Sequence, residues 1–212
     1  MHFLSDTLEQ YIEQHSDAEP TLLQALSRET HLKIIQPRMI TGHFQGRFLS
    51  LLSKILAPKK ILEIGTYTGY SALCLAEGMV EDGKLITLDV NEELEHRVRG
   101  YFEASPWRDR IDYRIADASN EIPKLDETWD LVFIDADKTG YVDYYTLLKP
   151  KMSPNGIIIA DNTLFHGEVL EEQISGKSAK AIQAFNEMVV KDEETEKIIL
   201  TIRDGLTLIR KK

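Results

Sequence analysis

Short apolar segments of this sequence carry or precede acidic side chains. If the segments are parallel strands, their carboxyl ends meet at one edge of a sheet, where open α/β proteins bind their ligands. A ring of carboxylates there suits a cationic ligand, a ligand rich in hydroxyl groups, or a metal ion. The side chains are Glu63 within Ile61–Ile64, Asp89 after Leu85–Leu88, Asp117 beyond Ile111–Ile115, Asp135 after Leu131–Ile134 and Asp161 after Ile157–Ala160.

Two of these segments bring hard oxygen ligands together. One delivers Asp135, Asp137 and Lys138, and the other delivers Asp161 directly followed by Asn162. Carboxylate and amide oxygens suit Mg²⁺, with Ca²⁺ or Mn²⁺ as alternatives, and no paired histidine or cysteine indicates zinc. An Asp–Asn pair after a strand is also a common turn, so the residues alone leave a metal site and a plain turn both open.

The first strand is followed by a glycine turn that suits a nucleoside. Gly65 and Gly69 let the backbone approach a ligand closely. The spacing matches neither the dinucleotide fingerprint nor a P-loop, so adenosine without phosphate fits better than NAD. Asp89 lies roughly 20 residues further on, where an acid commonly binds ribose hydroxyls. The alternative for Asp89 is a cap for a helix beginning near Asn91.

Four stretches together resemble the cation-dependent O-methyltransferases, the family of catechol and caffeoyl-CoA O-methyltransferases. They are Leu62–Ser71, Phe133–Lys138, Asp161–Leu164 and the tail Asp204–Thr207, and the resemblance runs from about Thr41 to the end of the chain. It implies an enzyme that transfers methyl from S-adenosylmethionine to a hydroxyl group. It also implies a Rossmann-like class I methyltransferase fold with strand order 3-2-1-4-5-7-6 and an antiparallel strand 7.

The resemblance also assigns roles to residues. It places Asp89 at the ribose, Asp117 and Ala118 beside the adenine, and Asp135, Asp161 and Asn162 on the metal. Lys138 matches the proposed general base, and Asp135 acts beside it; the lysine accepts a proton if burial and the metal lower its pKa. Met39 would lie near the transferred methyl. The implied cofactor contacts are Thr41, Glu63, Gly65, Thr66, Tyr67, Ser71, Asp89, Asp117, Ala118 and Asp135.

The acceptor is expected to be a catechol-like small molecule. A phenol has a pKa near ~10, so chelation by a divalent cation favours its oxyanion. Phe165 and His166 stand where caffeoyl-type enzymes carry a tryptophan, and their thioester-recognising features are not evident here. Two alternatives remain open: a tRNA hydroxyuridine O-methyltransferase of the same fold, and a non-catalytic cofactor-binding protein. The net charge of −10 disfavours nucleic acid.

Alternating strand and helix patterns must position these residues. They predict one α/β domain, with a helical N-terminal extension over residues 1–57 and an α/β core over 58–212. A first helix includes Leu4, and a third begins near Thr41 and ends before Pro58. Two β-rich runs flank Arg203-Asp204-Gly205, which predicts a terminal hairpin. The sheet should be mostly parallel and seven-stranded, with helices on both faces.

Composition sets the cellular context. The 212 residues include one cysteine, Cys74, in an apolar run, which excludes a disulfide framework and favours a buried thiol. The N-terminus has no signal-peptide pattern, and no apolar run approaches the ~20 residues of a membrane span. We therefore expect a cytoplasmic protein without membrane contact. The resemblance adds a homodimer.

Overall fold

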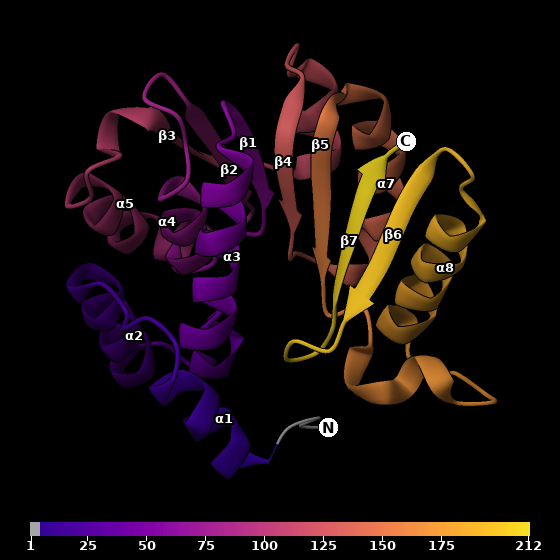
Figure 1. Cartoon of the computed structure of the whole chain (residues 1–212), viewed down its shortest axis with the longest axis horizontal. Helices are drawn as coiled ribbons and strands as arrows, with labels where there is room; N and C mark the ends of the chain where they lie inside the picture. The colour runs from indigo at the N-terminus through magenta and orange to yellow at the C-terminus, as the bar shows by residue number, and fades with distance from the viewer. Residues whose placement is uncertain (1–4) are drawn as a thin grey trace.

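The computed structural model describes residues 5–212, and Leu4, which the sequence places in the first helix, lies outside them. Seven strands form one sheet in the order β3-β2-β1-β4-β5-β7-β6 (Figure 1). Strand β7 runs antiparallel to both of its neighbours, as predicted. The strands are β1 (Lys60–Ile64), β2 (Lys84–Asp89), β3 (Ile111–Ile115), β4 (Trp129–Ile134), β5 (Met152–Asp161), β6 (Thr195–Leu200) and β7 (Leu206–Lys211).

Helices cover the sheet on both faces, which confirms the predicted class I methyltransferase architecture. Helices α2 to α5 pack on one face and α6 to α8 on the other. Figure 1 shows α7 behind the strands and α8 beside β6. Among residues 5–212, no helix is both long and apolar enough to cross a bilayer. The helices are α1 (Asp6–Gln14), α2 (Thr21–Lys33), α3 (His43–Leu56), α4 (Tyr70–Ala76), α5 (Glu95–Glu103), α6 (Ala118–Glu121), α7 (Tyr141–Leu148) and α8 (Lys177–Lys191).

Strand residues alternate between two separate cores. In β4, Phe133 packs with the side chains of α3, α4 and α5, whereas Ile134 packs with those of α7 and α8. The central strands are buried on both faces, which explains their continuous apolar runs. The same alternation places Ile159 of β5 on the α3 side of the sheet. Residue 161, two positions further along the strand, shares that face.

Helix α3 begins two residues later than its pattern predicted. Gly42, with φ +78°, precedes the first helical residue, His43, so Thr41 lies in the segment before the helix. At the other end Ala57 adopts a left-handed conformation with φ +47°. This confirms that the helix ends before Pro58, because proline disfavours helical geometry in the residue before it.

The terminal hairpin has a longer connection than Asp204-Gly205 alone would give. Five residues, 201–205, separate β6 from β7. The side chain of Arg203 donates to the main-chain oxygens of Arg38 and Ile40, and Asp204 accepts from the main-chain nitrogen of His166. The loop therefore contacts other loops in addition to reversing the direction of the chain.

Candidate functional site

The carboxyl ends of β1 and β4 meet at Gly65. The main-chain amide of Asp135 donates to the carbonyl of Ile64 at 2.8 Å. The main-chain amide of Gly65 donates to the carbonyl of Leu88, in β2, at 2.9 Å. Gly65 has φ +99°, and a Cβ added to it would lie 1.8 Å from the carbonyl oxygen of Asp135. Only glycine fits here, so the turn and the acidic segment after β4 form one compact edge.

Glu63 lies beneath the glycine turn with no solvent exposure. The Thr87 hydroxyl donates to its Oε2 at 2.5 Å, and the Thr66 hydroxyl lies 2.6 Å from that of Thr87. Oε1 has no hydrogen-bond partner among the described residues. Burial raises the pKa of Glu63 to about 8, helped by the charges of Asp135 and Asp89 and opposed by the nearby hydroxyl groups of Ser71 and Thr87. Such a carboxylate favours a cationic ligand.

Asp89 holds the shape of the turn through backbone amides. Its carboxylate accepts from the amide of Tyr67 at 2.7 Å and from that of Asn91 at 2.9 Å. Tyr67 has φ +48°, and its hydroxyl donates to the carbonyl of Gln36 at 2.8 Å. The helical turn that begins at Glu92 is capped by Asn91, whose side chain accepts from the amide of Glu93 at 2.9 Å, so the alternative that made Asp89 the cap was wrong. The bond to Tyr67 ties Asp89 to the predicted cofactor turn.

The remaining predicted cofactor residues occupy the same end of the sheet. Ser71 is buried in the first turn of α4, and Thr41 is buried just before α3. Asp117 is exposed and caps α6 by accepting from the amide of Asn120 at 3.1 Å, while Ala118 is buried. Their contacts with the adenine and the methionine portion stay predictions.

Asp135 and Asp161 form a pair of neighbouring carboxylates at the ends of β4 and β5. Asp161 is 4% exposed. Burial and the charge of Asp135 raise its pKa to about 7, although Lys138, a hydrogen bond from Gln45 and the charge of Arg203 oppose the shift. Repulsion between buried carboxylates is relieved by a cation.

The third predicted metal ligand is an amide. Asn162 has φ +57°, and its Nδ2 lies 3.5 Å from Oδ2 of Asp204. Within residues 5–212, no group of three or more histidine, cysteine, aspartate or glutamate side chains is placed to hold a metal. The candidate set of two carboxylates and one amide therefore depends on Asn162. Its all-oxygen chemistry fits a hard divalent cation.

Lys138 is held between a carboxylate and a phenol. Its Nζ donates to Oδ1 of Asp135 at 2.9 Å and to the Tyr141 hydroxyl at 2.9 Å. Burial alone would lower the pKa of Lys138, but the charges of Tyr141, Asp135 and Asp161 outweigh burial and raise it. The protein groups therefore do not provide the lowered pKa that the general-base role requires. The general-base role of Lys138 was expected for a site that holds the metal, and it stays a prediction.

Sequence reasoning missed several partners of the predicted residues. Gln45 on α3 donates from Nε2 to Oδ2 of Asp161 at 2.8 Å, and the Tyr141 hydroxyl lies 3.0 Å from the main-chain oxygen of Asp161. Gln45 is one of three buried polar residues of α3, with Ser50 and Ser53. Nothing in the sequence distinguished it from them or identified Asp161 as its partner.

Arg203 and Asp204 connect the β6–β7 loop to both sides of the site. The guanidinium of Arg203 donates to the carbonyls of Arg38, Ile40 and Thr41. Figure 1 shows this loop, in yellow, at the end of the sheet where α1 also lies. The segment before α3, which carries the predicted Met39 and Thr41, is thereby fixed over the carboxyl ends of the strands.

Comparisons with known proteins agree with the predicted family and fold. A family model described as O-methyltransferase matches residues 13–212. A Dictyostelium discoideum protein named "Probable caffeoyl-CoA O-methyltransferase 2" is 34% identical over 95% of this chain and 90% of its own. Caffeoyl-CoA O-methyltransferase 1 of Arabidopsis thaliana is 33% identical over 98% of this chain and 85% of its own.

Solved structures give the same picture. An O-methyltransferase from Bacillus cereus in complex with SAH (S-adenosylhomocysteine) superposes with a TM-score of 0.90 and 26% identity, covering 97% of each chain. An SAH-bound methyltransferase from Podospora anserina has a TM-score of 0.90 and 27% identity, covering 98% of this chain and 94% of its own. The predicted resemblance is confirmed.

Proposed function

We propose that this chain, which belongs to the O-methyltransferase family and uses S-adenosylmethionine, methylates one hydroxyl of a catechol-like small molecule with the help of a divalent cation. The observation that carries the metal role is the pairing of Asp135 with the buried Asp161 beside Asn162. These side chains present hard oxygen atoms at the edge of the sheet where the cofactor turn also lies.

The chain's own residues would divide the work. Asp89 and the Gly65 turn would hold the nucleoside, and the buried Glu63 would face the positive charges of the cofactor. Asp135, Asp161 and Asn162 would hold Mg²⁺, with Ca²⁺ or Mn²⁺ as alternatives. When bound, the cation supplies Lewis acidity that favours the ionised acceptor hydroxyl. Methyl transfer also requires that this oxygen be aligned with the methyl group.

Lys138 would have one of two roles, depending on the charges around it. Next to the bare carboxylates it is an ammonium group that can stabilise an acceptor oxyanion. If the negative charges of Asp135 and Asp161 are neutralised, two of the causes of its raised pKa are removed, and of the groups that raise it only Tyr141 still opposes the effect of burial. Lys138 can then accept the acceptor's proton at Nζ.

The proposed acceptor is a vicinal aromatic diol. Relatives are named for caffeoyl-CoA, and a caffeoyl group carries a catechol ring, so the reacting chemistry is shared. The proposal favours the small diol over the CoA ester. Comparing turnover of a simple catechol with that of a caffeoyl thioester would separate them; exclusive use of the thioester would contradict the small-molecule acceptor.

Chelation tests the metal role directly. Methyl transfer to catechol should require added Mg²⁺, stop in excess chelator and be lost in Asp161→Ala. The variant should still bind SAH, because Asp161 lies away from the Gly65 turn, and calorimetry checks this. Full activity in excess chelator would refute the metal requirement.

Two other outcomes would redirect the proposal. Label appearing in bulk tRNA incubated with labelled cofactor would favour the tRNA alternative, against which the net charge of −10 argues. Cofactor binding without turnover across a panel of catechols with Mg²⁺ would favour a non-catalytic role. The intact set of Asp135, Lys138, Asp161 and Asn162 speaks against the latter.

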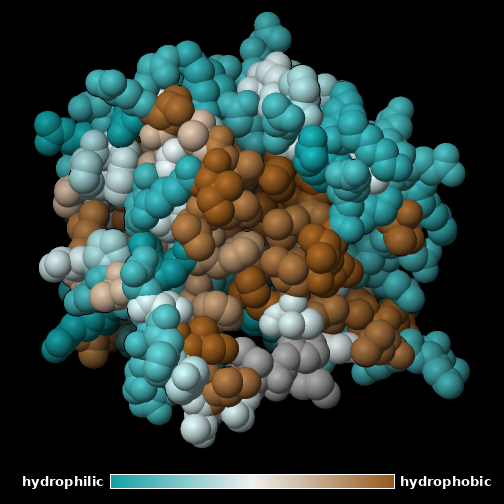
Figure 2. Space-filling model, in the orientation of Figure 1, coloured by the Kyte–Doolittle hydropathy of each residue, from teal (hydrophilic) through white to brown (hydrophobic). Residues whose placement is uncertain are grey.

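We also propose a homodimer through an apolar surface to which α3 and β6 contribute. Figure 2 shows a broad hydrophobic area on the face turned toward the viewer. Leu51 and Ile55 of α3 are 60% and 71% exposed, and Ile198 of β6 is 58% exposed. Monomeric proteins rarely expose apolar patches beyond a few hundred Å². A second copy would bury these side chains.

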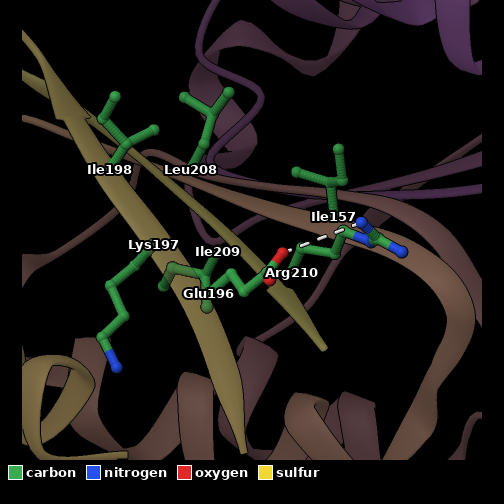
Figure 3. Close-up of a pocket in the computed structure, with 7 residues that line it drawn as sticks. All are labelled: Ile157, Glu196, Lys197, Ile198, Leu208, Ile209 and Arg210. Carbon is green, nitrogen blue, oxygen red and sulfur yellow. Dashed lines mark ion pairs between the residues drawn. The ribbon is translucent and has the colours of Figure 1, made fainter. Parts of the chain in front are cut away.

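A hollow beside this area suits an interface rather than the catalytic site. It has a volume of about 280 Å³ and is lined by residues of β5, β6 and β7, including Ile157, Ile198 and Leu208 (Figure 3). Glu196 and Arg210 form an ion pair at its border, 3.7 Å apart. Both signs of charge are therefore available to pair across a two-fold axis.

The cytoplasmic location of the protein stays a prediction.

A further inference from the structure

Gln45 is a buried residue of α3 that contacts the proposed metal site from outside the sheet. Its side chain has no solvent exposure, and its Nε2 donates to Oδ2 of Asp161 at 2.8 Å. Asp161 also accepts at Oδ1 from the amide of Asn162 at 2.7 Å. Both oxygens of this carboxylate are thereby held by donors, which fixes the plane in which its remaining lone pairs lie.

The other half of the same carboxamide has no partner. Oε1 of Gln45 is buried and accepts no hydrogen bond within residues 5–212. Buried polar atoms are almost always paired, so each exception calls for an explanation. Rotating the amide by half a turn would not help, because it would place Oε1 against the carboxylate of Asp161. A donor that arrives with a bound ligand would satisfy this atom.

We infer that Gln45 is a positioning residue for the divalent cation, an inference that rests on the proposed metal site. Gln45 holds the carboxylate of Asp161 in the orientation that a cation requires and offers Oε1 to a donor bound beside it. Residues that orient metal ligands typically change metal affinity by about 10–100-fold when they are removed. Gln45 reaches the site from α3, whereas the proposed ligands follow β4 and β5.

A purely structural role makes a different prediction. If the Gln45–Asp161 hydrogen bond only fastened α3 to the sheet, its removal would lower stability and leave metal affinity unchanged. Ser53 offers the matched case on the same helix. It is also fully buried, and its hydroxyl donates to the carbonyl of Leu75 at 2.6 Å, far along α3 from Gln45.

The test is a titration of the full chain with Mn²⁺ in the presence of SAH. Binding is measured by electron paramagnetic resonance as the loss of the signal of free Mn²⁺. Gln45→Met keeps the side-chain volume but removes both hydrogen-bonding atoms. We expect its Mn²⁺ Kd to rise by about 10–100-fold. Its SAH affinity should stay within about twofold of the wild type. Ser53→Ala should bind Mn²⁺ like the wild type, whatever stability it loses.

Two results would overturn the inference, and they are distinguishable. Wild-type Mn²⁺ affinity in Gln45→Met removes Gln45 from the site and leaves the metal proposal standing. Absence of Mn²⁺ binding to the wild-type protein removes the metal site and Gln45 with it. If Gln45→Met does not fold, Gln45→Asn replaces it, because this variant keeps a carboxamide but withdraws it from Asp161 by one methylene. Its Mn²⁺ Kd should rise as well, and an unchanged Kd counts against the inference.

Discussion

Replacing Gly65 by alanine tests the close approach on which the proposed cofactor site depends. The new methyl group would lie 1.8 Å from the carbonyl oxygen and 2.6 Å from the carbonyl carbon of Asp135. These are main-chain atoms, so no side-chain rotation can relieve the contact. The end of β1 must move away from the end of β4.

The magnitude follows from what that movement disrupts. Alanine in the positive-φ backbone of Gly65 costs about 1–2 kcal/mol. Separating the strand ends weakens two hydrogen bonds, Asp135 to Ile64 and Gly65 to Leu88, each worth about 1 kcal/mol. We therefore expect a loss of about 3–4 kcal/mol in the free energy of unfolding, which is at the upper end for a single substitution.

Urea unfolding and calorimetry with SAH measure the two consequences. Gly167→Ala is the matched control, because Gly167 has φ +86° but nothing within 4 Å of an added Cβ. The control should lose only about 1–2 kcal/mol from backbone strain. Gly65→Ala should also bind SAH at least about tenfold more weakly, which corresponds to about 1.4 kcal/mol. Equal destabilisation of the two variants, with normal SAH affinity, would refute the close approach.

Three further predictions concern the cofactor turn, a buried acid and the apolar face. Asp89→Ala should weaken SAH binding by about tenfold or more, about 1.4 kcal/mol in calorimetry, because Tyr67 loses its anchor; unchanged affinity would contradict it. The folded pKa of Glu63 is raised from 4.5 to about 8, so stability from its neutral form is complete below pH 4.5 and is lost as pH rises to 8. As pH rises from 4.5 to 8, the free energy of unfolding of Glu63→Gln should therefore increase relative to that of the wild type by a few kcal/mol, measured by urea unfolding. A difference that does not change with pH would refute the raised pKa of Glu63. Ile198→Glu should give a monomer in light scattering while Leu170→Glu, also exposed, should not; a dimeric Ile198→Glu would exclude this face.

The sequence was sufficient for β1, β2 and β4 because both faces of these strands are buried. Ile111–Ile115 was predicted with the observed bounds of β3, and β1, β2 and β4 were extended in the structure by only one or two residues. Strand β5 was predicted as four residues and extends over Met152–Asp161. Its first half contains Ser153, Pro154 and Asn155, which have low strand propensity. In that half only Met152 pairs with β4, at Trp129, before the register shifts and Ile157 pairs with Leu131.

The site was less predictable, because its properties depend on contacts between distant segments. The acids after β2, β4 and β5 could be assigned to one edge from topology alone. The raised pKa of Lys138 could not be predicted, since it depends on the spacing of three other groups. Neither could the bond from Gln45 to Asp161, which joins positions 116 residues apart. A buried polar residue requires a partner, but the sequence does not identify which residue it is.

The arrangement of charges at this edge is one that the proposed cations would stabilise. Glu63 and Asp161 are both buried, and Asp135 raises the pKa of each of them. Burying two carboxylates near a third lowers the stability of the empty fold, because charged groups lose hydration and repel one another. A sulfonium cofactor on the Glu63 side and a divalent cation on the Asp161 side would relieve the repulsion in two places. Asp135 interacts electrostatically with both Glu63 and Asp161. The carboxylate that couples these two acids is also the one that forms the ion pair with Lys138. The fold thus gives up stability at the place where the proposed chemistry needs negative charge.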